Sequence, residues 1–331
     1  MSRIDRGLDV ITGGSGFVGQ HLARELLRQG RRVTIIDPVH PGPLSAARGV
    51  RWIQGDVRDP DVMSRGLQGA NRGRVDRLFH LAAITGVRDS AETSEVFDIN
   101  VGGTLSVIRS ATEHGVGRVI YAGSSSVYGN TEIFPTPETA PLRPLSPYGE
   151  SKMRAEELVL NVRGHESGTT FAVVRFFTIF GTGGRPEMAI PTFLGRACSG
   201  EALPLLGSPD SFRDYTSVDD ALRGLLLVAE SDDLSGPVNI ASGRPVRLRD
   251  LVDVIGRTVG RRPECRWLPG NPLDVYGTHA DITAARRLGY APRVSLSGGI
   301  EEILRSAPGR YGRLPSSRTR DVGSIPEERR G

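Results

Sequence analysis

The sequence predicts an α/β protein with a doubly wound parallel sheet and a smaller, partly discontinuous C-terminal lobe. Over roughly the first 175 residues, short apolar runs alternate with segments of helical period. A glycine-rich turn joins the first apolar run to the first helical segment, and beyond Arg175 the alternation gives way to shorter segments rich in Pro and Gly. Strands that alternate with helices need crossover connections, which make neighbouring strands parallel.

Six strands are expected in the first part of the chain, each an apolar run bounded by polar residues or glycine. They cover residues 8–12, 32–36, 51–54, 77–81, 118–122 and 170–175. Helices are expected at 16–30, 96–113, 148–162, 189–199, 218–229 and 248–259. We therefore expect a first domain at 1–175, a lobe at 176–312 with segments that return to the first domain, and a disordered tail at 313–331.

Composition limits the kind of protein this can be. The chain has 331 residues and a net charge of +4, and its two cysteines, Cys198 and Cys265, lack metal-ligand spacing. No apolar run approaches the roughly 18 residues that a membrane span needs, and the basic residues are spread along the chain. These features predict a cytoplasmic protein with no metal, membrane or nucleic-acid partner.

The turn between the first strand and the first helix, residues 12–19, reads TGGSGFVG. Such glycines allow a tight turn, a close approach of the backbone to a pyrophosphate, and close packing of helix on strand. The helix N-terminus also offers N–H groups and the positive end of its dipole. We therefore predict a Rossmann-like NAD-binding domain. The predicted contacts in this turn are Gly13, Gly16, Phe17, Val18 and Gly19.

Asp37 ends the second expected strand. A carboxylate at this place accepts hydrogen bonds from a ribose 2′-hydroxyl and repels a 2′-phosphate, which favours NAD over NADP. A plain strand-end turn at Asp37-Pro38 is the less favoured alternative. Arg31 and Arg32, just before this strand, are expected to be solvated rather than to bind phosphate.

Tyr148 and Lys152 stand four residues apart in the segment YGESK. On a helix they share one face, and an ammonium near a phenol lowers the phenol pKa from about 10. A phenolate is the base needed to take a proton from a sugar hydroxyl. Lys152 is the only lysine in the chain, and there are seven tyrosines. A chance placement four residues after a tyrosine therefore has a probability of 7/331, about 2%.

Three serines, Ser124, Ser125 and Ser126, follow the strand expected at 118–122. One of these hydroxyls is a candidate donor to the sugar oxygen that loses its proton. A polar loop with capping serines is an equally good interpretation from composition.

Together these motifs resemble the extended short-chain dehydrogenase/reductase family, and within it the NAD-dependent nucleotide-sugar epimerase/dehydratase group. The nearest motifs are those of UDP-sugar 4-epimerases, and the resemblance covers roughly residues 8–305. It is carried by the glycine turn, GDVRD at 55–59, HLAA at 80–83, Asn100, SSSVYG at 124–129, SPYGESK at 146–152 and RDYTSVDD at 213–220.

The resemblance implies roles in binding the cofactor for four residues outside the glycine turn. Asp56 and Val57 are expected to hold the adenine. Ala82 and Asn100 are expected to line the cofactor pocket, together with Tyr148.

The resemblance also implies a site for a nucleotide-diphosphate sugar. Ser124 is expected to bridge Tyr148 and the sugar, and Lys152 to reach the nicotinamide ribose. Arg213 is expected to clamp the diphosphate, because a guanidinium makes charge-assisted contacts with phosphate. The group commonly forms homodimers through two helices, here 96–113 and 148–162.

The serines discriminate among the reactions of the group. Sugar 4,6-dehydratases carry an Asp-Glu pair where this chain has Ser125-Ser126, and glucuronate decarboxylases carry a Glu at the Ser126 position. Small hydroxyl residues are similar to those of the 4-epimerases, in which a transient 4-keto sugar takes hydride back on its other face. Dehydration or decarboxylation through the same NAD cycle stays an alternative, as does a catalytically inactive NAD-binding regulatory protein.

Two segments are similar to those of uronate epimerases: GVR at 86–88 and RPEMAI at 185–190. Arg88 or Arg185 could hold a C6 carboxylate, and a loop arginine that contacts backbone is an equal alternative.

Three positions depart from the group. Thr178 replaces an Asn that contacts the substrate phosphate, Asn271 replaces a second diphosphate Arg, and Leu206 replaces an aromatic residue near the base. The sugar and the base are therefore open.

Overall fold

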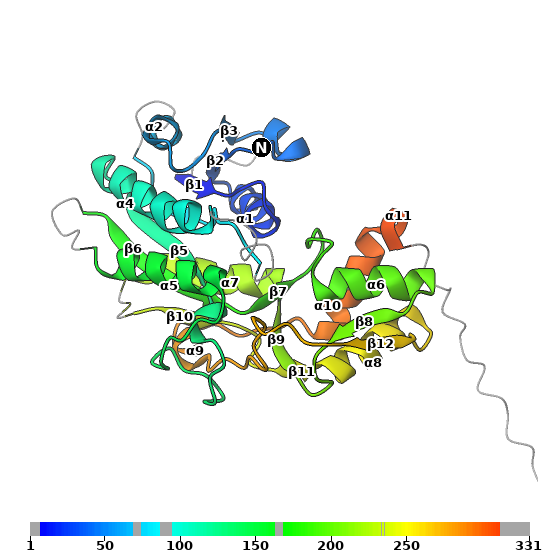
Figure 1. Cartoon of the computed structure of the whole chain (residues 1–331). Coiled ribbons are helices and arrows are strands. Elements are labelled where there is room, and N and C mark those ends of the chain that lie inside the picture. The colour runs from blue at the N-terminus through cyan, green and yellow to red at the C-terminus, as the bar shows by residue number, and fades with distance from the viewer. Residues whose placement is uncertain are drawn as a thin grey trace, which may run out of the picture.

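The structure is a computed structural model that describes residues 7–68, 74–86, 95–162, 168–232, 234 and 236–311. Its main element is a seven-stranded parallel sheet with the order β10-β6-β5-β4-β1-β2-β3 (Figure 1). The strands are β1 (Leu8–Thr12), β2 (Arg32–Asp37), β3 (Val50–Gln54), β4 (Arg77–His80), β5 (Arg118–Ser124), β6 (Thr170–Phe176) and β10 (Val238–Ile240). The predicted α/β class and doubly wound parallel sheet are confirmed.

Helices cover both faces of this sheet (Figure 1). One face carries α2 (Pro60–Leu67), α4 (Gly103–Glu113) and α5 (Pro147–Leu160), and the other carries α1 (Phe17–Arg28) and α7 (Val218–Glu230). Apolar residues at helical spacing on α1, such as Leu22 and Leu26, are fully buried against the sheet. This burial of one helix face is the main force that fixes the layers.

Most of the remaining elements form the C-terminal lobe and two small sheets, whereas α9 packs beside β10 of the main sheet (Figure 1). One sheet has the order β11-β9-β7 and the other pairs β12 with β8. The bounds are β7 (Thr178–Phe180), α6 (Ala189–Ser199), β8 (Leu203–Leu206), β9 (Phe212–Ser217), β11 (Pro245–Arg247), α8 (Leu248–Val259), β12 (Cys265–Leu268), α9 (Thr283–Arg287), α10 (Leu296–Ser306) and α11 (Pro308–Tyr311). The lobe has its own core, in which α6, α8 and α10 pack together.

Two expectations about local structure need correction. The helix expected at 96–113 starts at residue 96, but it is interrupted by a π-helical turn, Asp98–Gly102, before α4 continues from Gly103. Arg31 is not solvated: its side chain is 15% exposed because its guanidinium pairs with Asp9, which is fully buried, and with Asp76 at 2.8 Å. A buried carboxylate needs a cation and hydrogen bonds, and the sequence near Arg31 does not show that partner.

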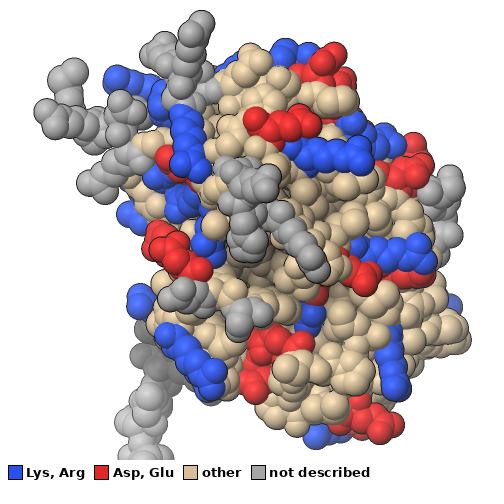
Figure 2. Space-filling model, turned by 90° about the vertical axis from the view of Figure 1, so that its left-hand side faces the viewer, with Lys and Arg blue, Asp and Glu red and all other residues tan. Residues whose placement is uncertain are grey.

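Acidic and basic side chains are interspersed on the face of the molecule shown in Figure 2. In the part of the chain that the structure describes, no helix combines the length and apolar character needed to cross a membrane.

Candidate functional site

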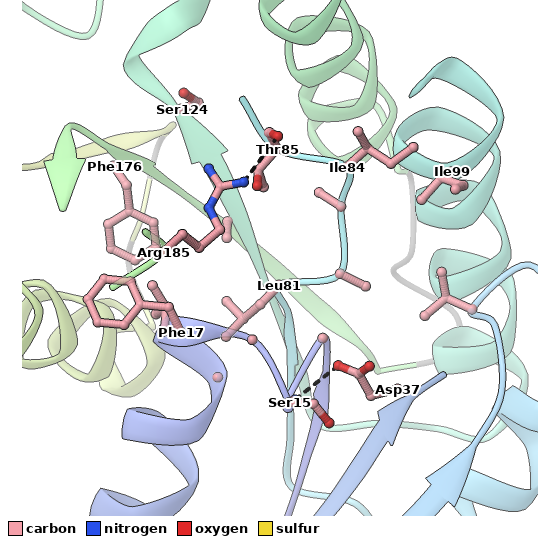
Figure 3. A pocket seen from close by; sticks show the side chains of 18 of the residues that line it. Ser15, Phe17, Asp37, Leu81, Ile84, Thr85, Ile99, Ser124, Phe176 and Arg185 are labelled. Carbon is pink, nitrogen blue, oxygen red and sulfur yellow. Dashed lines mark hydrogen bonds between the residues drawn. The ribbon is translucent and has the colours of Figure 1, made fainter. Parts of the chain in front are cut away.

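A cavity of about 580 Å³ lies at the carboxyl ends of the parallel strands, where β1 and β4 are neighbours and the strand order reverses (Figure 3). Ligands of open α/β sheets bind at such a switch point. Many residues predicted from the sequence line this cavity: Gly13, Gly16, Phe17, Val18, Gly19, Asp37, Asp56, Val57, Ala82, Ser124, Tyr148, Lys152 and Arg185.

The glycine turn packs too tightly for side chains at two positions. Gly13 has a φ of +73°, and a Cβ there would lie 2.6 Å from the backbone nitrogen of Ala82. A Cβ at Gly19 would overlap the carbonyl oxygen of Gly13. The helix that follows begins after Gly16 without a capping side chain, so its first-turn N–H groups face the cavity without an internal acceptor. This is the cradle that a pyrophosphate needs.

Asp37 ends β2 with its carboxylate fixed at the cavity wall. One carboxylate oxygen accepts a hydrogen bond from the backbone N–H of Ser15 at 2.9 Å (Figure 3), and the other accepts from Val39 at 2.9 Å. The indole of Trp52 donates to the Asp37 carbonyl at 3.1 Å. A rigid carboxylate in this place fits the two hydroxyls of an adenosine ribose.

Replacing Asp37 with Asn is expected to lower the preference for NAD over NADP at least about tenfold, since the variant loses a charge-assisted acceptor and no longer repels a 2′-phosphate. Quenching of Trp52 fluorescence by each dinucleotide measures the two affinities; Trp267 is the only other tryptophan. An unchanged ratio of affinities would place the ribose elsewhere.

Asp56 and Asn100 have different relations to the cavity. The Asp56 carboxylate lines it and accepts bonds from the Arg58 guanidinium at 2.8 and 3.1 Å, which hold its pKa below the ordinary value. Asn100 lies behind the cavity wall. Its amide bonds both backbone groups of Ile84, at 2.8 and 3.0 Å, and donates to the Ser151 hydroxyl at 2.8 Å. Asn100 therefore supports the wall segment 81–85.

Tyr148 and Lys152 are brought to the cavity by α5. Ser146 caps this helix by accepting from the backbone N–H of Gly149 at 3.1 Å, and Pro147 occupies its first turn. Burial raises the pKa of the Tyr148 phenol, while a hydrogen bond with Ser124 and the charge of Arg185 act to lower it. The expectation of a lowered phenol pKa is therefore wrong for the protein by itself, because desolvation outweighs the hydrogen bond with Ser124 and the charge of Arg185.

Lys152 is 4% exposed. Burial lowers the pKa of its ammonium from 10.5 to about 7, and the carboxylate of Glu156 opposes that change. The Lys152 ammonium therefore gains and loses its proton near neutral pH.

The three serines divide into one at the cavity and two beside it. Ser124 ends β5 and lines the cavity. Its hydroxyl accepts from the backbone N–H of Ser126 at 3.2 Å and donates to the Ser126 hydroxyl at 3.1 Å. Ser125 and Ser126 form the turn that follows and are half-buried, and they are not among the residues of the cavity wall.

The predicted substrate arginines are not gathered in one place. The Arg185 guanidinium points across the cavity and donates to the Thr85 carbonyl at 3.4 Å (Figure 3). Arg213 lies outside this wall and donates to the carbonyls of Phe212, Val275 and Tyr276 at 2.9, 2.7 and 3.2 Å. Arg88 lies outside the described residues.

Thr178 is half-buried at the start of β7 and is not part of the wall. Both of its neighbours in sequence, Phe177 and Ile179, line the cavity.

Sequence reasoning missed several residues of the cavity wall. Gly123 and Phe176 stand at the carboxyl ends of β5 and β6, and Ile84 and Thr85 follow β4. The rule that sites form beyond the carboxyl ends of parallel strands would have pointed to these positions. Phe17 and Phe176 lie on the same side of the cavity (Figure 3).

Comparisons with known proteins agree with this site. The profile described as the NAD dependent epimerase/dehydratase family matches residues 10–241. UDP-glucuronate 4-epimerase 3 of Arabidopsis thaliana is 32% identical, over 93% of this chain and 78% of that protein. The structure of MoeE5 in complex with UDP-glucuronic acid and NAD is 34% identical, with a TM-score of 0.82 over 91% of this chain and 100% of the other.

A dehydratase is similar in structure as well. The structure of a DesIV double mutant (dTDP-glucose 4,6-dehydratase) from Streptomyces venezuelae is 28% identical, with a TM-score of 0.84 over 92% of this chain and 98% of the other. Fold similarity alone therefore does not separate epimerases from dehydratases. The family profile covers more than half of the residues, and the chain belongs to the NAD dependent epimerase/dehydratase family.

Proposed function

We propose that this chain is an NAD-dependent nucleotide-sugar 4-epimerase, an isomerase, and that its substrate is a UDP-linked hexuronate. One observation carries the proposal: a single cavity holds the dinucleotide cradle, the phenol of Tyr148, the hydroxyl of Ser124 and the guanidinium of Arg185. A base, a hydroxyl that orients the sugar and a cation for a carboxylate are the groups that such a reaction needs.

The residues of the cavity fit NAD. The glycine turn and the first turn of α1 would hold the pyrophosphate, Asp37 the adenosine ribose, and Asp56 with Val57 the adenine. When bound, NAD would supply the hydride acceptor for C4 of the sugar and the hydride donor for the opposite face of the ketone, so that no net redox change would occur.

Tyr148 is the proton acceptor in this scheme. Its phenolate removes the proton of the C4 hydroxyl as hydride leaves, and the phenol formed in that step gives the proton back when the ketone is reduced. Ser124, which shares a hydrogen bond with Tyr148, orients the reacting oxygen. Lys152, on the next turn of the same helix, supplies positive charge near the phenolate.

The two serines that follow Ser124 favour epimerisation over dehydration. Elimination of water needs an acid and a base near C5 and C6, and Ser125 and Ser126 carry no carboxylate. Mass spectrometry of the product tests this choice. An epimer keeps the mass of the substrate, whereas loss of water or carbon dioxide would assign the chain to the other reactions.

The charge of Arg185 favours an acidic sugar. Its guanidinium reaches into the cavity from the C-terminal lobe, close enough to Tyr148 for its charge to oppose the rise in phenol pKa that burial causes. A carboxylate at C6 is a ligand that a guanidinium binds with charge-assisted hydrogen bonds.

Replacing Arg185 with Leu is expected to lower kcat/KM for UDP-glucuronate about 10–100-fold more than for UDP-glucose, because only the former loses an ion pair. The ratio between the two sugars is the measurement, since any effect through Tyr148 is shared by both. Arg24, exposed on α1, is the matched control, and Arg24→Leu is expected to leave the ratio unchanged. Equal losses for both sugars would remove Arg185 from carboxylate recognition.

The diphosphate is assigned to Arg213. This guanidinium donates to three backbone carbonyls, two of them in the segment 275–276, which leaves two of its five N–H groups for a phosphate. Thr178 is assigned to the phosphate side of the same substrate, and Ser125 and Ser126 to its sugar side.

We also propose a cytoplasmic homodimer formed through α4 and α5. Leu160 on α5 is 49% exposed, and Phe97, Val101 and Arg154 line a shallow hollow between the two helices. An exposed leucine beside a hollow that is lined by both apolar and charged side chains is suited to a self-complementary interface. Light scattering should give twice the chain mass of 35.7 kDa; a monomer mass would contradict this interface.

A further inference from the structure

Lys152 touches an aromatic ring that the proposed reaction does not use. Its ammonium nitrogen lies 4.3 Å from the centroid of the Tyr121 ring. Tyr121 stands on β5, three residues before Ser124, and is 1% exposed. A cation over the face of an aromatic ring is attracted by the ring quadrupole, and most strongly where water is absent.

The other charged and titratable groups around Lys152 are engaged elsewhere. Glu156, one turn further along α5, is bound by the Arg175 guanidinium at 2.5, 3.0 and 3.2 Å. His80 on β4 contacts the hydroxyls of Thr12 and Thr104 at 2.7 and 3.0 Å, and burial together with Lys152 lowers its pKa to about 3. His80 is therefore neutral, and the Glu156 carboxylate, which raises the pKa of Lys152, is paired with Arg175.

The Tyr121 hydroxyl makes a weaker contact with the same lysine. It donates to the backbone carbonyl of Lys152 at 3.3 Å, which is longer than most O–H···O bonds. This bond fixes the helix backbone, whereas the ring lies under the charge itself. The two parts of the side chain can therefore be tested separately.

We propose that Tyr121 is a positioning residue for Lys152, and that the face of its ring keeps the ammonium charged and aimed at the cavity. The inference rests on the proposed function in one respect, namely that Lys152 takes part in the reaction. The contact between ring and ammonium is independent of which sugar is bound.

Three replacements separate the ring from the hydroxyl and from the volume of the side chain. Tyr121→Phe keeps the ring and removes the hydroxyl, and Tyr121→Leu removes the ring. Replacement of Tyr121 with 3,4,5-trifluorophenylalanine keeps the shape and withdraws electrons from the ring face, so it serves even where the Leu variant fails to fold. We expect near wild-type kcat with Phe and a loss of about tenfold with the other two.

The single lysine of this chain makes a direct measurement possible. In full-length protein labelled with ¹³C- and ¹⁵N-lysine, all labelled side-chain NMR signals come from one residue, Lys152. In the wild type and in Tyr121→Phe, the ring should shift the signals of the protons on Cε upfield. The two proteins should also give the same pKa for Lys152. In Tyr121→Leu the upfield shift should vanish, and the pKa of Lys152 should fall by about one unit in both the Leu and the trifluorophenylalanine variants.

The titration needs no sugar, so it tests Tyr121 even where no epimerase activity is found. An unchanged Lys152 pKa in both the Leu and the trifluorophenylalanine variants would overturn the proposal. A loss of kcat in Tyr121→Phe as large as that in Tyr121→Leu would also overturn the proposal, because the effect would then come from the hydroxyl and not from the ring.

Discussion

Replacing Tyr148 with Phe is expected to lower kcat about a thousandfold, within the range of about 10²–10⁴ that a positioned proton-transfer group contributes. The change removes the phenolic oxygen and keeps the ring that lines the cavity. Cofactor binding should therefore survive, while the C4 hydroxyl loses its proton acceptor. The measurement is kcat with UDP-glucuronate, together with the NAD content of the variant.

Tyr290 offers a matched control for this change. It is 2% exposed, and its hydroxyl donates to the Ala241 carbonyl at 3.0 Å, away from the cavity wall. Tyr290→Phe removes the same atom from a buried tyrosine and is expected to change stability without the thousandfold loss of kcat. If Tyr148→Phe kept wild-type kcat, the proposed chemistry at this cavity would have to be abandoned.

Replacing Lys152 with Met is expected to have opposite effects on activity and stability. Activity should fall at least about a hundredfold, because the phenolate loses its neighbouring positive charge and the site loses a donor to the ribose. Stability near and below pH 7 should rise, because the fold no longer buries an ammonium. Removing a charge from an active site commonly produces such a trade-off.

The stability gain should depend on pH in a definite direction. In the unfolded chain Lys152 keeps its proton up to a pKa near 10.5, whereas the folded protein releases it at about 7. Between these values the unfolded state binds more protons, so the free energy of unfolding of the wild type rises with pH, by at most about 1.4 kcal/mol per pH unit. The advantage of the Met variant is therefore largest below pH 7 and shrinks towards pH 10. Urea unfolding at pH 6 and pH 9 measures this, and an advantage independent of pH would refute the shifted pKa.

Local sequence patterns predict most strands and helices of the first domain, but they do not predict how these elements are arranged in space. The apolar runs at β1, β2 and β5 mark strands, and Ser146-Pro147 marks the start of α5. By contrast, β10 has three residues, too few to show a period, yet it completes the sheet beside β6. The spacing of apolar residues likewise predicts a helix but does not reveal the π-helical turn before α4.

The candidate site divides in a similar way. The cradle, Asp37 and the Tyr148–Lys152 pair are motifs of short range, so their spacing is visible in the sequence. The burial of Lys152 over Tyr121 depends on how β5 meets α5. Two of the three carbonyls that hold Arg213 come from a segment some 60 residues away. Interactions of this kind arise from tertiary packing, which no local pattern encodes.

The proposed reaction returns hydride to the carbon from which it came, and isotope labelling tests that property directly. UDP-glucuronate that carries deuterium at C4 should be converted by the purified protein into the C4 epimer with deuterium still at C4, and no NADH should accumulate. Loss of the label, or NADH formation without an epimer, would contradict a 4-epimerase centred on Tyr148.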